Sequence, residues 1–125
     1  MSGSDKFLMI TSEFPPGPGG IGNHAYNLAK YLKINGKEIK VLTVSDYTGK
    51  AESENFDKLQ NFEITRFERY GNRVKTYLER ISLIKKNLRE GKFTHVIFSG
   101  RFALFCCAML SKDRYRAKLI SIVHG

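Results

Sequence analysis

The sequence is poor in cysteine and proline, lacks tryptophan and has no long apolar run. Its two cysteines, Cys106 and Cys107, are adjacent, and adjacent cysteines rarely bridge because the geometry is strained. We therefore expect both to be reduced core residues of a cytoplasmic protein. No second group of Cys and His residues has the spacing of metal ligands, so no metal is expected. No stretch approaches the roughly 20 apolar residues of a membrane span, and the N-terminal residues lack the apolar segment of a secretory leader.

Acidic residues are also scarce, at 12 against 21 basic ones, which gives a net charge of +9. Much of the excess falls in residues 66–92, where nine Lys and Arg stand against three acids. This balance suggests contact with nucleic acid, an anionic membrane or a negatively charged ligand. Nucleic acid is disfavoured, because the segment has neither a recognition motif nor an aromatic platform. A solvated helix face and a peripheral contact with the inner membrane face both stay open.

Strand and helix patterns alternate along residues 1–125, which predicts a single α/β domain. The expected strands are residues 6–12, 38–44, 62–67, 94–99 and 117–123, and the expected helices are 20–35, 73–90 and one near 102–111. The polar segment 46–60 is expected to be an exposed loop with at most one helical turn near 56–59. The helix over 73–90 has one apolar stripe, formed by Val74, Tyr77, Leu78, Ile81, Ile84 and Leu88. Such alternation predicts an open, mostly parallel sheet of order 3-2-1-4-5 with helices on both faces.

The segment 13–24 holds all three prolines and four of the eleven glycines. It separates the first expected strand from the first helix, so it aims the unpaired N–H groups of a helix N-terminus at whatever binds over it. Glycines allow a phosphate to approach the backbone closely, and the helix dipole favours an anion. Ligands of open parallel sheets bind at the carboxyl ends of the strands. Ser99 and Arg101 after the fourth strand and His124 after the fifth are expected at the same edge.

The run Gly17–Gly22 also fits the G-x-G-x-x-G pattern of dinucleotide-binding domains, with Asp46 as the ribose-binding acid. In that turn the first glycine follows the strand almost directly, whereas Ser12, Glu13, Phe14, Pro15 and Pro16 come before it here. Pro18 stiffens the loop and removes one N–H group that a phosphate would use. An NAD-dependent oxidoreductase domain is therefore a minor alternative. A stand-alone nucleotide- or phosphate-binding module without catalysis is the other alternative.

The motifs together are more specific than the glycines alone. The chain contains Glu13-Phe14-Pro15-Pro16, then Gly19-Gly20-Ile21-Gly22, then Leu28-Ala29-Lys30-Tyr31-Leu32, and it ends with Ile122-Val123-His124-Gly125. This combination resembles the opening of the family-four retaining glycosyltransferases, which have the GT-B architecture of two Rossmann-like domains. The resemblance implies that residues 1–125 form the N-terminal, acceptor-side Rossmann-like domain of such an enzyme.

The resemblance implies a hexosyltransferase that moves a sugar from a nucleotide-sugar to a glycan, lipid-linked or small-molecule acceptor with retention, without a metal or other cofactor. It implies that the loop Gly19, Gly20, Ile21 and Gly22 meets the donor diphosphate, and that His124 acts as the catalytic residue near the transferred sugar. The acceptor-side candidates are Asn23, His24, Ser99 and Arg101. The donor-binding domain of the family is not in the sequence, so we expect a truncated domain that is inactive alone. The apolar face where that domain packs would favour self-association.

Overall fold

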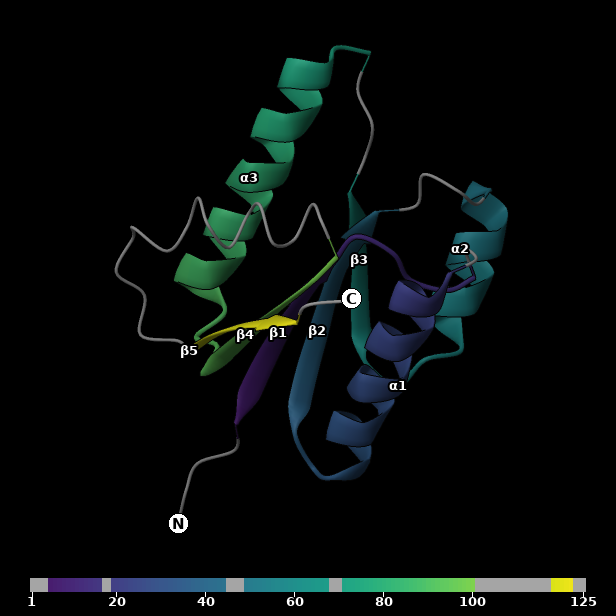
Figure 1. The fold of residues 1–125 in the computed structure, drawn as a ribbon, viewed down its shortest axis with the longest axis vertical. Coiled ribbons are helices and arrows are strands. Elements are labelled where there is room, and N and C mark those ends of the chain that lie inside the picture. Colours follow the sequence, from purple (N-terminus) through teal and green to yellow (C-terminus); the bar gives the residue numbers. More distant parts are fainter. Residues whose placement is uncertain (1–4, 17–18, 45–48, 68–70, 101–117, 123–125) are drawn as a thin grey trace.

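Five parallel strands form one open sheet in the computed structural model, in the order β3-β2-β1-β4-β5 (Figure 1). The structure describes residues 5–16, 19–44, 49–67, 71–100 and 118–122. The strands are β1 (Lys6–Thr11), β2 (Glu38–Val44), β3 (Glu63–Phe67), β4 (His95–Ser99) and β5 (Lys118–Ile122). The predicted order is confirmed, with β3 at one edge of the sheet and only partly buried.

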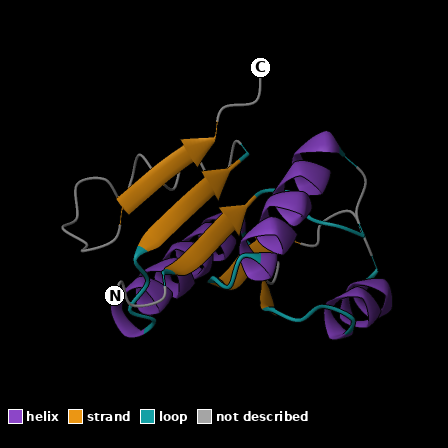
Figure 2. Ribbon diagram, turned by 90° about the horizontal axis from the view of Figure 1, so that it is seen from below, coloured by secondary structure: helices purple, strands orange, loops and turns teal. Residues whose placement is uncertain are grey.

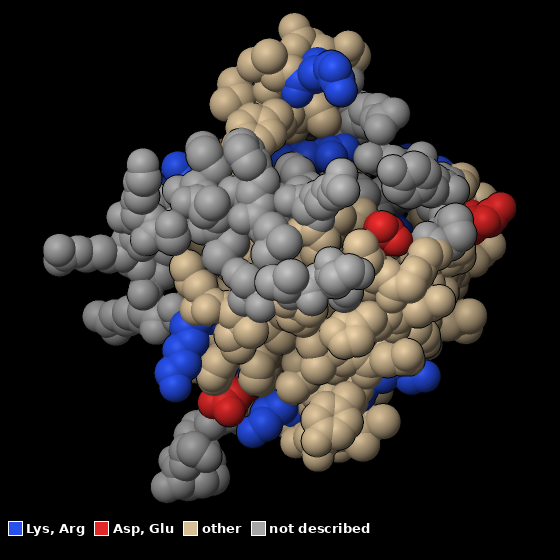
Figure 3. All heavy atoms as spheres, in the orientation of Figure 1, with Lys and Arg blue, Asp and Glu red and all other residues tan. Residues whose placement is uncertain are grey.

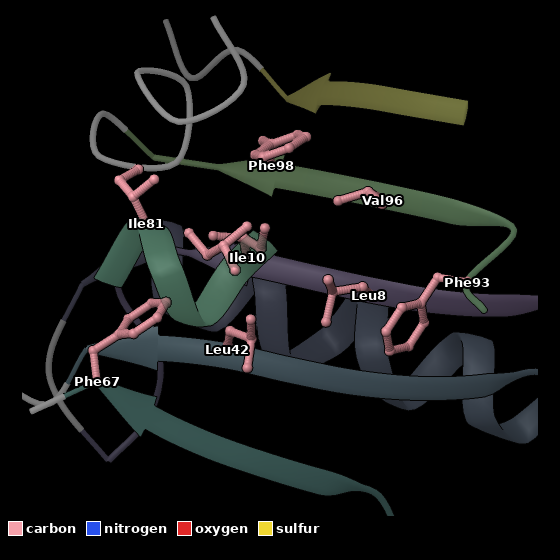
Figure 4. Packing of buried hydrophobic residues seen from close by; sticks show 9 residues of the cluster. Leu8, Ile10, Leu42, Phe67, Ile81, Phe93, Val96 and Phe98 are labelled. Atoms are coloured by element: carbon pink, nitrogen blue, oxygen red, sulfur yellow. The ribbon is translucent and has the colours of Figure 1, made fainter. Parts of the chain in front are cut away.

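Helices cover both faces of the sheet, which also confirms the prediction (Figure 2). They are α1 (Gly20–Ile34), α2 (Lys50–Lys58) and α3 (Arg73–Glu90). Side chains of the central strand β1 point alternately to the two faces of the sheet, and since helices cover both faces, the strand is buried almost throughout. Phe7 and Met9 pack in a cluster with Ala25 and Ala29 of α1, whereas Leu8 and Ile10 pack in a second cluster with residues of α3. Figure 4 shows this second cluster between the sheet and α3.

The segment 46–60 differs from its prediction, because residues 50–58 form the helix α2 instead of an exposed loop. The segment offers almost no apolar periodicity, so the usual pattern of an amphipathic helix is absent. The helix is held by a few specific contacts. Phe56 packs against the rings of Phe14 and Tyr26, and Asp57 pairs with Arg66. Most of these partners are distant in sequence, so the local pattern could not indicate them.

The helix α3 has the predicted bounds, but its predicted apolar stripe is only partly buried. Ile81 and Ile84 lie in the core, whereas Val74 is 65% exposed and Leu78 is 59% exposed. Figure 1 gives the reason, since the first turns of α3 extend beyond the carboxyl ends of the strands. The stripe continues past the sheet surface that would cover it.

Several predicted features lie outside the described residues. They are the helix near 102–111 with Cys106 and Cys107, and Asp46. None of the helices in the described ranges is long and apolar enough to cross a membrane.

Candidate functional site

The loop after β1 and the turn after β4 meet at the carboxyl edge of the sheet. β1 and β4 are parallel neighbours, so their ends lie side by side. The Ser12 N–H group donates a hydrogen bond of 2.9 Å to the Ser99 carbonyl. Gly100 has a φ of 94°, and a side chain at this position would collide with Ser12. The structure therefore brings the two predicted segments together at the switch point, where open parallel sheets bind ligands.

The segment before the glycines is fixed by packing. The Thr11 hydroxyl donates to the Glu13 carbonyl at 2.8 Å, which turns the chain as it leaves β1. Phe14 is 3% exposed, and its ring meets the rings of Tyr26 and Phe56 edge-on at centroid distances of 5.7 and 6.1 Å. Such aromatic contacts contribute about 0.5–1.5 kcal/mol each beyond the area that they bury. Sequence reasoning missed Phe56, because its contacts depend on the unexpected helix α2.

The three described glycines of the loop differ in what a side chain would meet at each position. Gly19 has a φ of 128°, a conformation that L side chains rarely adopt, and a side chain there would collide with the Glu13 carboxylate. Gly22 lies against backbone, so that a Cβ atom would be 3.0 Å from the Phe14 nitrogen. Gly20 has open space, since no atom lies within 4 Å of the place that a Cβ atom would take. The loop therefore leaves free space at Gly20 and at no other of its described glycines.

The first turn of α1, which begins at Gly20, carries backbone donors that make no intrahelical bond. The helix begins at Gly20, no side chain caps its N-terminus within the described part, and its first turn contains no acid. The N–H groups of Gly20, Ile21 and Gly22 precede the first intrahelical bond, which the Asn23 N–H group donates to the Gly19 carbonyl. Such groups and the helix dipole together favour an anion.

The other predicted residues fall into three groups. Asn23 and His24 are exposed on the first turn of α1, beside the glycines. The side chain of Ser99 is fully buried. Arg101 and His124 lie outside the described residues. Over the described ranges, no group of three or more His, Cys, Asp and Glu side chains is placed to hold a metal ion.

An open parallel sheet with helices on both faces and a glycine loop at its carboxyl edge is a Rossmann-like fold. Residues 18–125 match the sequence model of Glycosyltransferase Family 4. The chain belongs to this family, which confirms the resemblance drawn from its motifs. Membership also disfavours the alternative of a dinucleotide-dependent oxidoreductase domain.

One of the similar solved structures supports the same fold. MurG of Acinetobacter baumannii is similar with a TM-score of 0.63 and 18% identity over 94% of this chain and 34% of that chain. LpCGTa, solved in complex with UDP, gives a TM-score of 0.49 and 18% identity over 95% of this chain and 30% of that chain. The chain thus spans about a third of the length of these proteins. Comparison with curated protein sequences gave no match.

Proposed function

We propose that this chain forms the acceptor-side half of an enzyme that transfers a sugar from a nucleotide-sugar to an acceptor with retention of configuration. The observation that carries the proposal is the N-terminus of α1 at the carboxyl edge of the sheet, which no side chain of the described residues caps and where Gly20 has open space around its Cβ position. Membership of Glycosyltransferase Family 4 supports it.

The backbone donors of this helix N-terminus would act on the leaving group. Negative charge builds up on the donor diphosphate as its bond to the sugar breaks, and donors that are already oriented stabilise this charge without reorganising. The packing of Phe14 and the close contact at Gly22 fix the backbone that carries them. In the proposal the backbone donors and basic side chains neutralise the diphosphate, and no metal takes part.

The acceptor would lie beside the same turn. Asn23 and His24 are exposed there and are proposed to contact it. The buried position of Ser99 does not support a direct contact with an acceptor. For Arg101 and for the catalytic role of His124, the proposal rests on the family resemblance alone. Since GT-B enzymes read the nucleotide with a second Rossmann-like domain, we expect the 125-residue chain alone to show no sugar transfer.

A titration followed by amide NMR tests the proposal. UDP, GDP and ADP should each shift the resonances of Gly20, Ile21 and Gly22 with similar, weak affinity, because this half meets only the diphosphate. Uridine, which has no phosphate, should shift none of them. Tighter binding of NAD(H), or shifts confined to other regions, would refute the proposed role of the loop.

Two glycines provide a matched pair of variants for this titration. Gly20 and Gly49 both lie at helix starts without a side-chain cap, and both have open space around a Cβ position. Gly20→Ala places a methyl group where the diphosphate would bind and should weaken UDP binding severalfold. Gly49→Ala, at the start of α2, should leave UDP binding unchanged.

A second candidate function, attachment to an anionic membrane, is favoured by the projecting end of α3. Val74 and Leu78 are exposed there, and they lie at three- or four-residue steps from Ser82, Lys85 and Arg89 along one side of the helix. Figure 3 shows basic side chains on this projecting end and just below it. An apolar tip in line with cations suits the surface of an anionic bilayer, where each basic residue contributes about 1 kcal/mol.

Sedimentation with vesicles tests this second candidate. The chain should bind vesicles of phosphatidylglycerol and not those of phosphatidylcholine, and reversing the charges of Lys85, Lys86 and Arg89 should abolish binding. Leu78→Ser should weaken binding, whereas Ile34→Ser, at an exposed apolar position on α1, should not. Equal binding to both kinds of vesicle, or no effect of charge reversal, would exclude the idea.

A further inference from the structure

The side chain of Arg66 is a buried cation that links three segments of the chain. Arg66 lies near the carboxyl end of β3, and only 10% of its side chain is exposed. Its Nε and Nη2 atoms donate to the two carboxylate oxygens of Asp57 in α2, at 3.0 and 2.9 Å. The same Nη2 atom donates to the carbonyl of Pro15, at 2.7 Å. One guanidinium group therefore joins β3, α2 and the segment that leads into the glycine loop.

The geometry of this contact is demanding. A two-pronged pair with a carboxylate fixes the plane of the guanidinium, so Asp57 determines where Nη2 points. The third nitrogen, Nη1, is buried without a hydrogen-bond partner among the described residues. Burying ions is costly, and buried ion pairs often contribute no more stability than apolar residues of similar size. Stability alone is thus a poor explanation for an arginine at this position.

The contact lies where it can orient the glycine loop. Pro15 follows Phe14 directly, and the Phe14 nitrogen is the nearest atom to a Cβ position on Gly22. A shift of the Pro15 carbonyl would therefore move the backbone against which the first turn of α1 packs. The aromatic contacts of Phe14 hold this backbone through its side chain, and Arg66 holds it through the Pro15 carbonyl.

We propose that Arg66 is a positioning residue for the glycine loop, oriented by Asp57, and that α2 contributes to the site through this pair. The consequence of this positioning for ligand binding rests on the proposed function, in which Gly20–Gly22 meet a diphosphate. The pair sets the direction of the loop donors without touching the ligand. This gives the unexpected helix α2 a role in the site.

Amide NMR and hydrogen exchange on the ligand-free chain test the positioning role directly. Arg66→Lys keeps the charge and loses the planar fork, and Asp57→Asn keeps the shape and loses the charge. Both variants should shift the amide resonances of Phe14 and Gly20–Gly22 and speed their exchange. Glu63→Gln is the matched control, since it removes an ion pair of 3.2 Å with Lys40 at the other end of β3. It should leave the loop resonances unchanged.

Titration with UDP then separates the two proposals. Arg66→Lys should weaken UDP binding severalfold, because displaced donors no longer point at the diphosphate, and Glu63→Gln should not. If the unaltered chain shows no shifts with UDP, the proposed function fails, and the ligand-free loop resonances still decide the role of Arg66. Loop resonances that match the unaltered chain in both Arg66→Lys and Asp57→Asn, with changes confined to α2 and β3, would overturn the positioning role.

Discussion

Two glycine-to-alanine changes within the first turn of α1 should alter stability in opposite directions. Gly20 and Gly22 are both helical and differ by two positions. Alanine is favoured over glycine in a helix and restricts the unfolded chain, which together stabilise by about 0.4–1 kcal/mol where the new side chain fits. At Gly20 it fits, because nothing lies within 4 Å of the Cβ position. Gly20→Ala should therefore be neutral or stabilising.

Gly22→Ala should be destabilising. Its Cβ atom would lie 3.0 Å from the Phe14 nitrogen and 3.2 Å from both the Glu13 carbonyl carbon and the Phe14 Cα atom. These are backbone atoms, and Phe14 and Pro15 are held by the aromatic cluster and by Arg66, so they have little freedom to move. Overpacking of this kind costs about 1–3 kcal/mol, which exceeds the gain in helix propensity.

Thermal and urea unfolding of the two variants and the unaltered chain measure the difference. We expect Gly22→Ala to be less stable than Gly20→Ala by about 1–3 kcal/mol, or roughly 4 °C in melting temperature for each kcal/mol. Gly49→Ala also has open space, but Gly49 is the N-cap of α2, where glycine is favoured over alanine, so this variant should be neutral or slightly destabilising. Equal stabilisation by Gly20→Ala and Gly22→Ala would show that the backbone at residues 13–14 yields, and the argument that this loop is rigidly held would be wrong.

Two further predictions concern the helices. Phe56→Ala should destabilise the chain by about 2 kcal/mol. This is below the range for a fully buried ring, because Phe56 is only partly buried against Phe14 and Tyr26. Chemical denaturation measures the change, and an unaltered stability would show that Phe56 does not anchor α2. Ile84→Ala, at a fully buried position of α3, should cost about 2–5 kcal/mol. Leu78→Ala, at a 59% exposed position of the same helix, should cost less than about 0.5 kcal/mol, and similar losses for the two would contradict the observed end of the buried stripe.

The sheet could be predicted because its strands are short apolar runs separated by clear helix and turn patterns. The bounds of β2 and α3 match the prediction, and α1 is followed by Gly36 with a φ of 80°, as is common for glycine after a helix. The helix α2 could not be predicted, because its stability depends on Phe14, Tyr26 and Arg66 and not on its own pattern. The exposure of Val74 and Leu78 could not be predicted either, because it also depends on tertiary structure. Periodicity locates an apolar stripe, but it does not show how far the covering sheet extends.

The candidate site was also only partly predictable from the sequence. Its place at the carboxyl edge follows from strand order and from the position of the glycines, both of which the sequence reveals. The geometry of the site cannot be predicted in this way, because the three glycines of one motif are explained by three different features of the structure. Gly19 is required by its backbone conformation, Gly22 by contact with backbone, and only Gly20 leaves room for a ligand. The contact at Gly22 is with the backbone of Glu13 and Phe14, and that segment packs against residues of β3 and α2 that no motif contains. The backbone proposed to recognise the diphosphate thus follows a segment that contacts residues far away in the sequence, namely Phe56 and Arg66, and Arg66 is in turn paired with Asp57.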